Sequence, residues 1–130
     1  MTDTLFTIHS FVRYLALLAG VGAVVTALLG WRRAGLPPRA ERALAGAFVG
    51  FLDLQVVLGV LLLVSGFQFY GALIGHLVMM VLAAATAHVA SAMARRREPA
   101  RSGSSVRALG FLLALVFIVG GIMAIQRSIL

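Results

Sequence analysis

Four long apolar stretches constrain the fold of this chain more than any other feature of the sequence. They run over about residues 5–31, 43–65, 71–94 and 106–126. Each reaches the roughly 20 residues that an α-helix needs to span a bilayer. Hydrophobic residues form 62% of the chain, above the roughly 45–50% of a soluble domain, so lipid has to cover part of the surface. The sequence therefore predicts an all-α, integral membrane four-helix bundle, with residues 1–130 forming a single transmembrane domain.

The positions of the arginines predict the orientation of this bundle. The formal net charge is +7 and the basic residues are all arginines, most of which lie in or beside the connections 32–42 and 95–107. Basic connections stay in the cytoplasm, so the charge indicates topology rather than nucleic-acid binding. We expect an up-down-up-down, multi-pass protein of the bacterial inner (cytoplasmic) membrane with both termini outside. Helix ends are expected at Pro37, Pro38, Pro99 and Gly103.

Histidine is the residue type best suited to bind a metal in this chain. There is no cysteine, which excludes disulfides, iron–sulfur clusters, thiolate zinc sites and covalent haem attachment. Ionisable residues inside a membrane cost about 2.5–3.5 kcal/mol on insertion scales, and are therefore candidates for a function. The polar candidates within the apolar stretches are His9, Arg13, Asp53, Gln55, His76 and His88.

Small residues at helical spacing predict which face of each helix meets the others, because helices in lipid pack where their backbones approach closely. We expect the polar candidates to share these interior faces. The predicted interior residues are His9, Arg13, Ala16, Gly20, Ala23 and Ala27; Gly46, Gly50, Asp53 and Val57; His76, Met80, Ala83, Ala87 and Ala90; and Gly110, Ala114, Phe117 and Gly121.

The depths of the histidines suggest a haem site. His9 and His76 fall near the outer ends of the first and third helices, where two imidazoles can ligate one iron from opposite sides. The alternative is that each is an interfacial histidine bonded to backbone or water. His88 is about 18 Å deeper than His76 at 1.5 Å per residue. We therefore expect His88 to ligate a second haem, to form a buried hydrogen bond or to relay protons.

Arg13 and Asp53 have two interpretations. They form an ion pair that satisfies two costly charges, or Arg13 faces a haem propionate while Asp53 orients His88 or handles protons. Ser10 and Tyr14 flank this cluster. They are either hydrogen-bond donors to a quinone carbonyl or ordinary interfacial residues.

Three segments carry a resemblance to a known family. IHSFVRYL, LDLQVVLGVLLL, and His76 with AHVA resemble the small bacterial four-helix membrane proteins labelled cytochrome b-like. Their pattern is HSxxRxL, DLQxxLGLLL, a histidine opening helix three and an AH pair near its inner end. The resemblance implies a b-type haem, with His9, His76 and His88 at the histidine positions of the family. This chain departs from the pattern at Gly75, where an acidic residue is expected.

The resemblance implies a b-type haem membrane subunit that carries electrons to or from quinone, or within a larger redox complex. His9 and His76 are then the axial ligands, Arg13 lies near the propionates, and the partners are membrane lipid and other membrane subunits. The cluster of His9, Ser10 and Arg13 is also similar to the quinone and haem corner of succinate dehydrogenase membrane anchors. The chain offers no catalytic group of its own, so it is at most a redox subunit.

Two other function classes stay open. The first is a structural accessory subunit of a respiratory or photosynthetic complex that binds lipid or pigment, where histidine can also ligate the magnesium of a chlorin. The second is a small transporter or channel with Asp53, Arg13 and His88 along a proton path. Against the second, the sequence shows no pair of broken helices of the transporter type.

Overall fold

The computed structural model describes residues 2–32, 38–66, 71–96 and 100–125. These residues form four α-helices: α1 (Thr2–Arg32), α2 (Pro38–Val64), α3 (Ala72–Arg95) and α4 (Ala100–Ala124). Each helix is long and apolar enough to cross a membrane. The prediction of an all-helical bundle with four candidate membrane spans is therefore confirmed.

Helices α1, α2 and α4 begin earlier than the sequence predicted, and the difference is largest for α2 and α4. Pro38 opens α2 instead of ending a helix, which its ring permits because the first helical turn leaves its N–H groups without intrahelical partners. Gly103 lies inside α4, which begins at Ala100, so the expectation of a helix end at Gly103 is wrong. Gly66 follows α2 with a φ of 102°, the left-handed conformation that commonly ends a helix. Pro37 and Pro99 lie outside the described residues.

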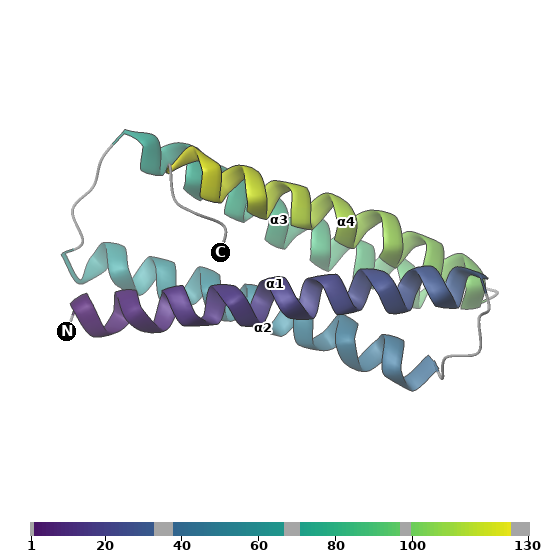
Figure 1. Ribbon diagram of the computed structural model, residues 1–130. Coiled ribbons are helices and arrows are strands. Elements are labelled where there is room, and N and C mark those ends of the chain that lie inside the picture. Colours follow the sequence, from purple (N-terminus) through teal and green to yellow (C-terminus); the bar gives the residue numbers. More distant parts are fainter. Residues whose placement is uncertain (1, 33–37, 67–70, 97–99, 126–130) are drawn as a thin grey trace.

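The helices form two tightly packed pairs, α1 with α2 and α3 with α4, joined mainly through α1 and α4. Contact between α2 and α3 is the sparsest of these. In Figure 1 the starts of α1 and α3 lie at the same end of the molecule as the ends of α2 and α4. We call this the histidine end, because it holds His9 and His76, and the opposite one the arginine end, because it holds Arg32, Arg95 and Arg107.

Glycines and alanines bring the helices close together. A Cβ at Gly110 on α4 would collide with the Cβ of Ala90 on α3, and one at Gly103 would lie 2.8 Å from the carbonyl oxygen of Ala94. Near the centre, the rings of Phe48 and Phe111 meet edge to face with centroids 5.3 Å apart. Both rings are fully buried. Packing at this density depends on small residues wherever two backbones approach.

The predicted interior faces are correct for three helices and wrong for α2. Ala16, Ala23 and Ala27 of α1, Ala83, Ala87 and Ala90 of α3, and Ala114 of α4 are all buried. On α2, however, Gly46 and Gly50 are exposed, and Val57 is 54% exposed. The opposite side of α2 faces the bundle with Phe48 and Leu52, because Gly20 of α1 leaves room for the Phe48 ring.

Candidate functional site

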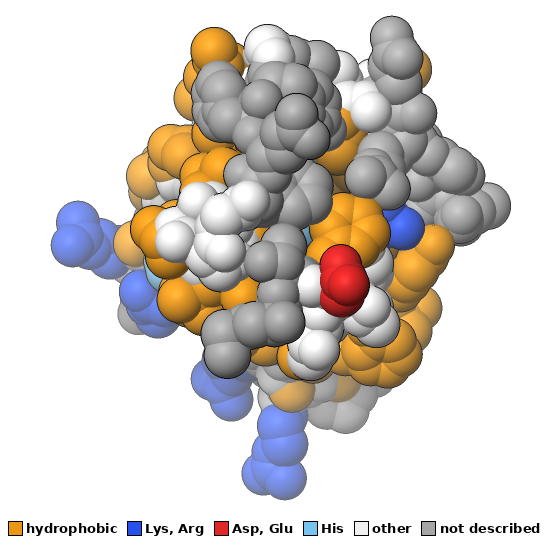
Figure 2. All heavy atoms as spheres, turned by 90° about the vertical axis from the view of Figure 1, so that its left-hand side faces the viewer, with side chains coloured by type: hydrophobic (Ala, Val, Ile, Leu, Met, Phe, Trp, Pro, Cys, Tyr) orange, Lys and Arg blue, Asp and Glu red, His pale blue; other side chains and the backbone are white. Residues whose placement is uncertain are grey.

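A pocket at the histidine end draws side chains from all four helices. Its polar members are His9, Ser10 and Arg13 of α1, Gln55 of α2 and His76 of α3. Apolar side chains, including Leu52, Met80, Ile118 and Ile122, complete the lining. Figure 2 looks onto this end of the bundle, where hydrophobic side chains lie among polar ones, an acidic side chain is in view and most of the visible Lys and Arg side chains lie at the edge. The pocket thus brings polar side chains of three helices together with apolar side chains of all four.

Three polar atoms in this pocket are buried without a hydrogen-bond partner. They are Nδ1 of His9, Nε of Arg13 and Oε1 of Gln55; among the described residues, only Nε of Arg107 shares this condition. Buried polar groups in native proteins nearly always have a partner. Their gathering in one place indicates a site that a polar ligand or water completes.

His76 is held in a defined orientation by the backbone of α4. Its Nδ1 lies 2.9 Å from the carbonyl oxygen of Gly121. A carbonyl only accepts, so Nδ1 carries the proton and donates it, and in the neutral ring Nε2 is the nitrogen that has the lone pair. This is the arrangement by which proteins orient a metal-ligating histidine and raise its basicity. Gly121 permits the approach, because a Cβ there would lie 3.1 Å from the Cβ of Met79.

His9 reaches the same pocket from α1. Its ring lies beside α2, where a Cβ added at Gly59 would come within 3.7 Å of Cε1. It shares the pocket lining with His76 and Arg13. The two histidines that the sequence placed at equal depth thus line one pocket.

The polar residues of the pocket are suited to bind a haem, but the cavity between them is too small to hold one. Two imidazoles and a guanidinium are the groups that ligate a haem iron and pair with its propionates. The void measures about 60 Å³, room for about two waters and far less than a porphyrin. Haem binding therefore requires the apolar lining to move and the helices to separate at this end. The described residues contain no group of three or more His, Asp or Glu that could hold a metal ion, but axial ligation of haem takes only one or two.

Arg13 does not pair with Asp53, so that prediction is wrong. Its Nη2 donates to the hydroxyl of Tyr14 at 2.9 Å, and its guanidinium carbon lies 4.7 Å from the centroid of the Tyr14 ring. Tyr14 is exposed and does not line the pocket, whereas Ser10 does. Tyr14 thus holds the outer side of Arg13 while the Nε of Arg13 is buried beside the two histidines.

Asp53 instead binds His88, as the alternative interpretation expected. Nε2 of His88 lies 2.7 Å from Oδ1 and 2.9 Å from Oδ2 of Asp53. The side chains of His88 and Asp53 are 55% and 49% exposed, so the expectation that Asp53 points into the bundle is wrong. Asp53 follows Leu52 by about 100° around α2, which turns it away from the core. The pair therefore bridges α2 and α3 on the outer surface, separate from the pocket.

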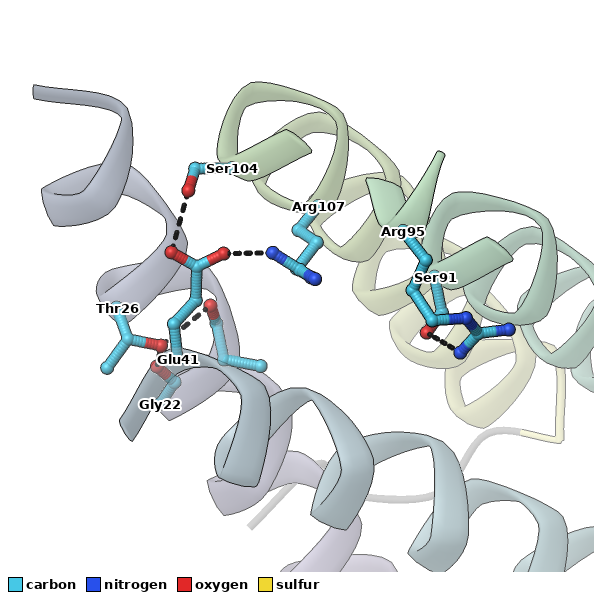
Figure 3. Close-up of polar contacts among 8 residues, drawn as sticks. Gly22, Thr26, Glu41, Ser91, Arg95, Ser104 and Arg107 are labelled. Carbon is cyan, nitrogen blue, oxygen red and sulfur yellow. Dashed lines mark hydrogen bonds and ion pairs between the residues drawn. The ribbon is translucent and has the colours of Figure 1, made fainter. Parts of the chain in front are cut away.

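Glu41 is a buried acidic residue that the sequence-based prediction missed. It is 5% exposed and accepts hydrogen bonds from Ser104 Oγ at 2.7 Å and Arg107 Nη1 at 2.5 Å, as Figure 3 shows. A Cβ at Gly30 would collide with Glu41 Oε1, so α1 needs a glycine there. In the sequence, Glu41 lies in the arginine-rich segment 32–42, which is typical of a solvated loop. The signal that could have identified it is that Glu41 is the single acidic residue of this segment. This cluster ties α1, α2 and α4 together at the arginine end.

Comparison of the chain with protein-family models, with curated proteins and with solved structures finds no match. The structure itself defines the class as a helical bundle with four helices able to cross a membrane. The cytochrome b-like resemblance stays a prediction that rests on its motif residues.

Proposed function

We propose that this chain is a b-type haem membrane subunit that carries electrons, with His9 and His76 as the residues that would hold the haem iron. The observation that carries the proposal is the meeting of these two histidines in one pocket whose buried polar atoms lack partners. Bound there, the haem supplies a one-electron couple within the apolar interior.

The residues of the chain have distinct roles in this proposal. The Gly121 carbonyl holds the His76 ring so that Nε2 is free to bind iron, and it strengthens that nitrogen as a ligand. Arg13 presents a planar guanidinium that matches a propionate carboxylate, steadied from outside by Tyr14. Ser10 and Gln55 add a hydroxyl and an amide to the lining. These last two are suited to bind a propionate or a quinone carbonyl.

The proposed partner of the haem is the quinone pool, reached directly or through a larger complex in the membrane. We expect a short-chain quinol to reduce the haem of the purified protein in mild detergent, seen as growth of the α band. Arg13→Ala and Ser10→Ala are expected to slow this reduction relative to the matched surface variant Thr7→Ala. A haem that dithionite reduces but quinol does not would contradict quinone as the partner.

We also propose an up-down-up-down path across the bacterial cytoplasmic membrane, with the histidine end and both termini outside. The support is that Arg32, Arg95 and Arg107 lie at the other end, because basic ends remain in the cytoplasm. The absence of native cysteine allows a direct test with Gly71→Cys and Arg96→Cys, both at exposed positions. An impermeant maleimide should label the first in intact spheroplasts and the second only after permeabilisation. The reverse pattern would invert the orientation.

A further inference from the structure

Helix α2 presents an unusual surface that the bundle does not use. Gly46 and Gly50, one turn apart, are exposed, and a Cβ added at either would meet nothing within 4 Å. Asp53 and Val57 continue the same stripe at helical spacing. We call these four residues, together with His88 of α3, the glycine face. In membranes, two glycines four residues apart let a second helix approach closely.

The ion pair on this face is poorly suited to contact with lipid. Asp53 and His88 are both about half exposed, and they lie within candidate membrane spans of α2 and α3. Exposed apolar side chains, including Leu54 and Val89, surround them. Ionisable groups at such depth normally face protein or water. The pair therefore indicates that protein covers this part of the surface.

The two helices of this face are also the least covered by their own chain. Within their most apolar windows, 28% of α2 and 22% of α3 is buried, compared with 44% of α1. Contact between α2 and α3 is sparse, and the bond between Asp53 and His88 spans it. The uncovered surface, the exposed glycines and the ion pair thus coincide.

We infer that a second copy of this chain covers the glycine face and forms a twofold dimer in the membrane. Copies inserted in the same orientation are related by an axis along the membrane normal, which sets the two α2 stripes against each other. Neither stripe has bulk at Gly46 or Gly50 to prevent the approach.

Charge balance favours an identical copy over a charged partner. The face carries both an acid and a base, Asp53 and His88, which already bond each other within one chain. The pair therefore leaves no unpaired charge to repel its counterpart when twofold symmetry brings two such faces together away from lipid. A face of one charge would require a partner of the opposite charge, whereas this balanced face accepts its own copy.

Cross-linking of the full chain in native membranes tests the dimer. Gly50→Cys is expected to form a disulfide-linked dimer under mild oxidation, because each α2 meets its counterpart there. The matched control is Leu112→Cys, which is 50% exposed on α4, outside the glycine face and equally far from the start of its helix. We expect no linked dimer above background from the control.

A steric variant gives a second readout. Gly50 is exposed, and a Cβ added there meets nothing within 4 Å in the same chain, so we expect Gly50→Phe to fold as one chain and to block a second helix. We expect it to weaken dimerisation in liposomes by about tenfold or more, measured by energy transfer between labelled chains, while Leu112→Phe leaves it unchanged. Equal cross-linking of the two cysteine variants, links only to a protein of different mass, or an unchanged equilibrium for Gly50→Phe would each overturn the dimer. None of these measurements depends on haem.

Discussion

Alanine at His76 is expected to abolish haem binding, with loss of the b-type absorbance band from the purified protein. The substitution removes the Nε2 ligand that the hydrogen bond from Nδ1 to the Gly121 carbonyl holds in place. His9→Ala is expected to have the same effect, because the iron would keep only one imidazole. The measurement is the haem content of protein purified from cells with ample haem supply, normalised to protein.

The controls separate ligation from folding. His88→Ala should retain full haem, since His88 lies on the outer surface bound to Asp53 and not in the pocket. His76→Met should retain some haem with a raised potential, as methionine ligation does. Helical content by circular dichroism checks that each variant folds. Full pigment in both His9→Ala and His76→Ala would show that the ligand assignment is wrong.

Glu41→Leu is expected to lower the free energy of unfolding by about 3–5 kcal/mol, because breaking a buried ion pair leaves one charge unpaired. Arg107 is only 12% exposed and its Nε already lacks a partner, so its guanidinium would have no buried acceptor. Unfolding in mixed micelles, followed by the fluorescence of Trp31, the single tryptophan, measures the loss.

A double variant shows whether the lost stability comes from the unpaired charge or from altered packing. Glu41→Leu with Arg107→Leu removes both charges and should recover most of the lost stability, since apolar residues often replace a buried pair without penalty. Glu41→Gln keeps an acceptor for Ser104 and should fall between the parent and Glu41→Leu. A single Glu41→Leu variant as stable as the parent would show that this cluster does not hold the arginine end together.

The sequence predicted the helices well because apolar length alone identifies a candidate span. The interior faces of α1, α3 and α4 were predicted correctly from the positions of their small residues. The same rule failed on α2, where Phe48 and Leu52 fill the centre and the glycines face outward. Small residues mark a close contact, but they do not say whether its partner belongs to the same chain.

The pocket was predictable only in part. Depth along the helices brought His9 and His76 together, since the rise per residue is fixed. The Gly121 carbonyl could not be foreseen, because any residue offers a backbone acceptor. The expected pair of Arg13 and Asp53 failed because Asp53 points away from the side of α2 that faces α1, whereas Gln55, two positions on, faces the pocket.

The most direct test of the central claim is a dithionite-reduced minus air-oxidised absorbance spectrum of the purified protein in mild detergent, with a pyridine haemochrome assay for stoichiometry. The proposal predicts a sharp b-type α band and haem in proportion to the chain. Absence of haem, in protein made with ample haem supply, would contradict the electron-carrier proposal and favour a structural subunit of a membrane complex.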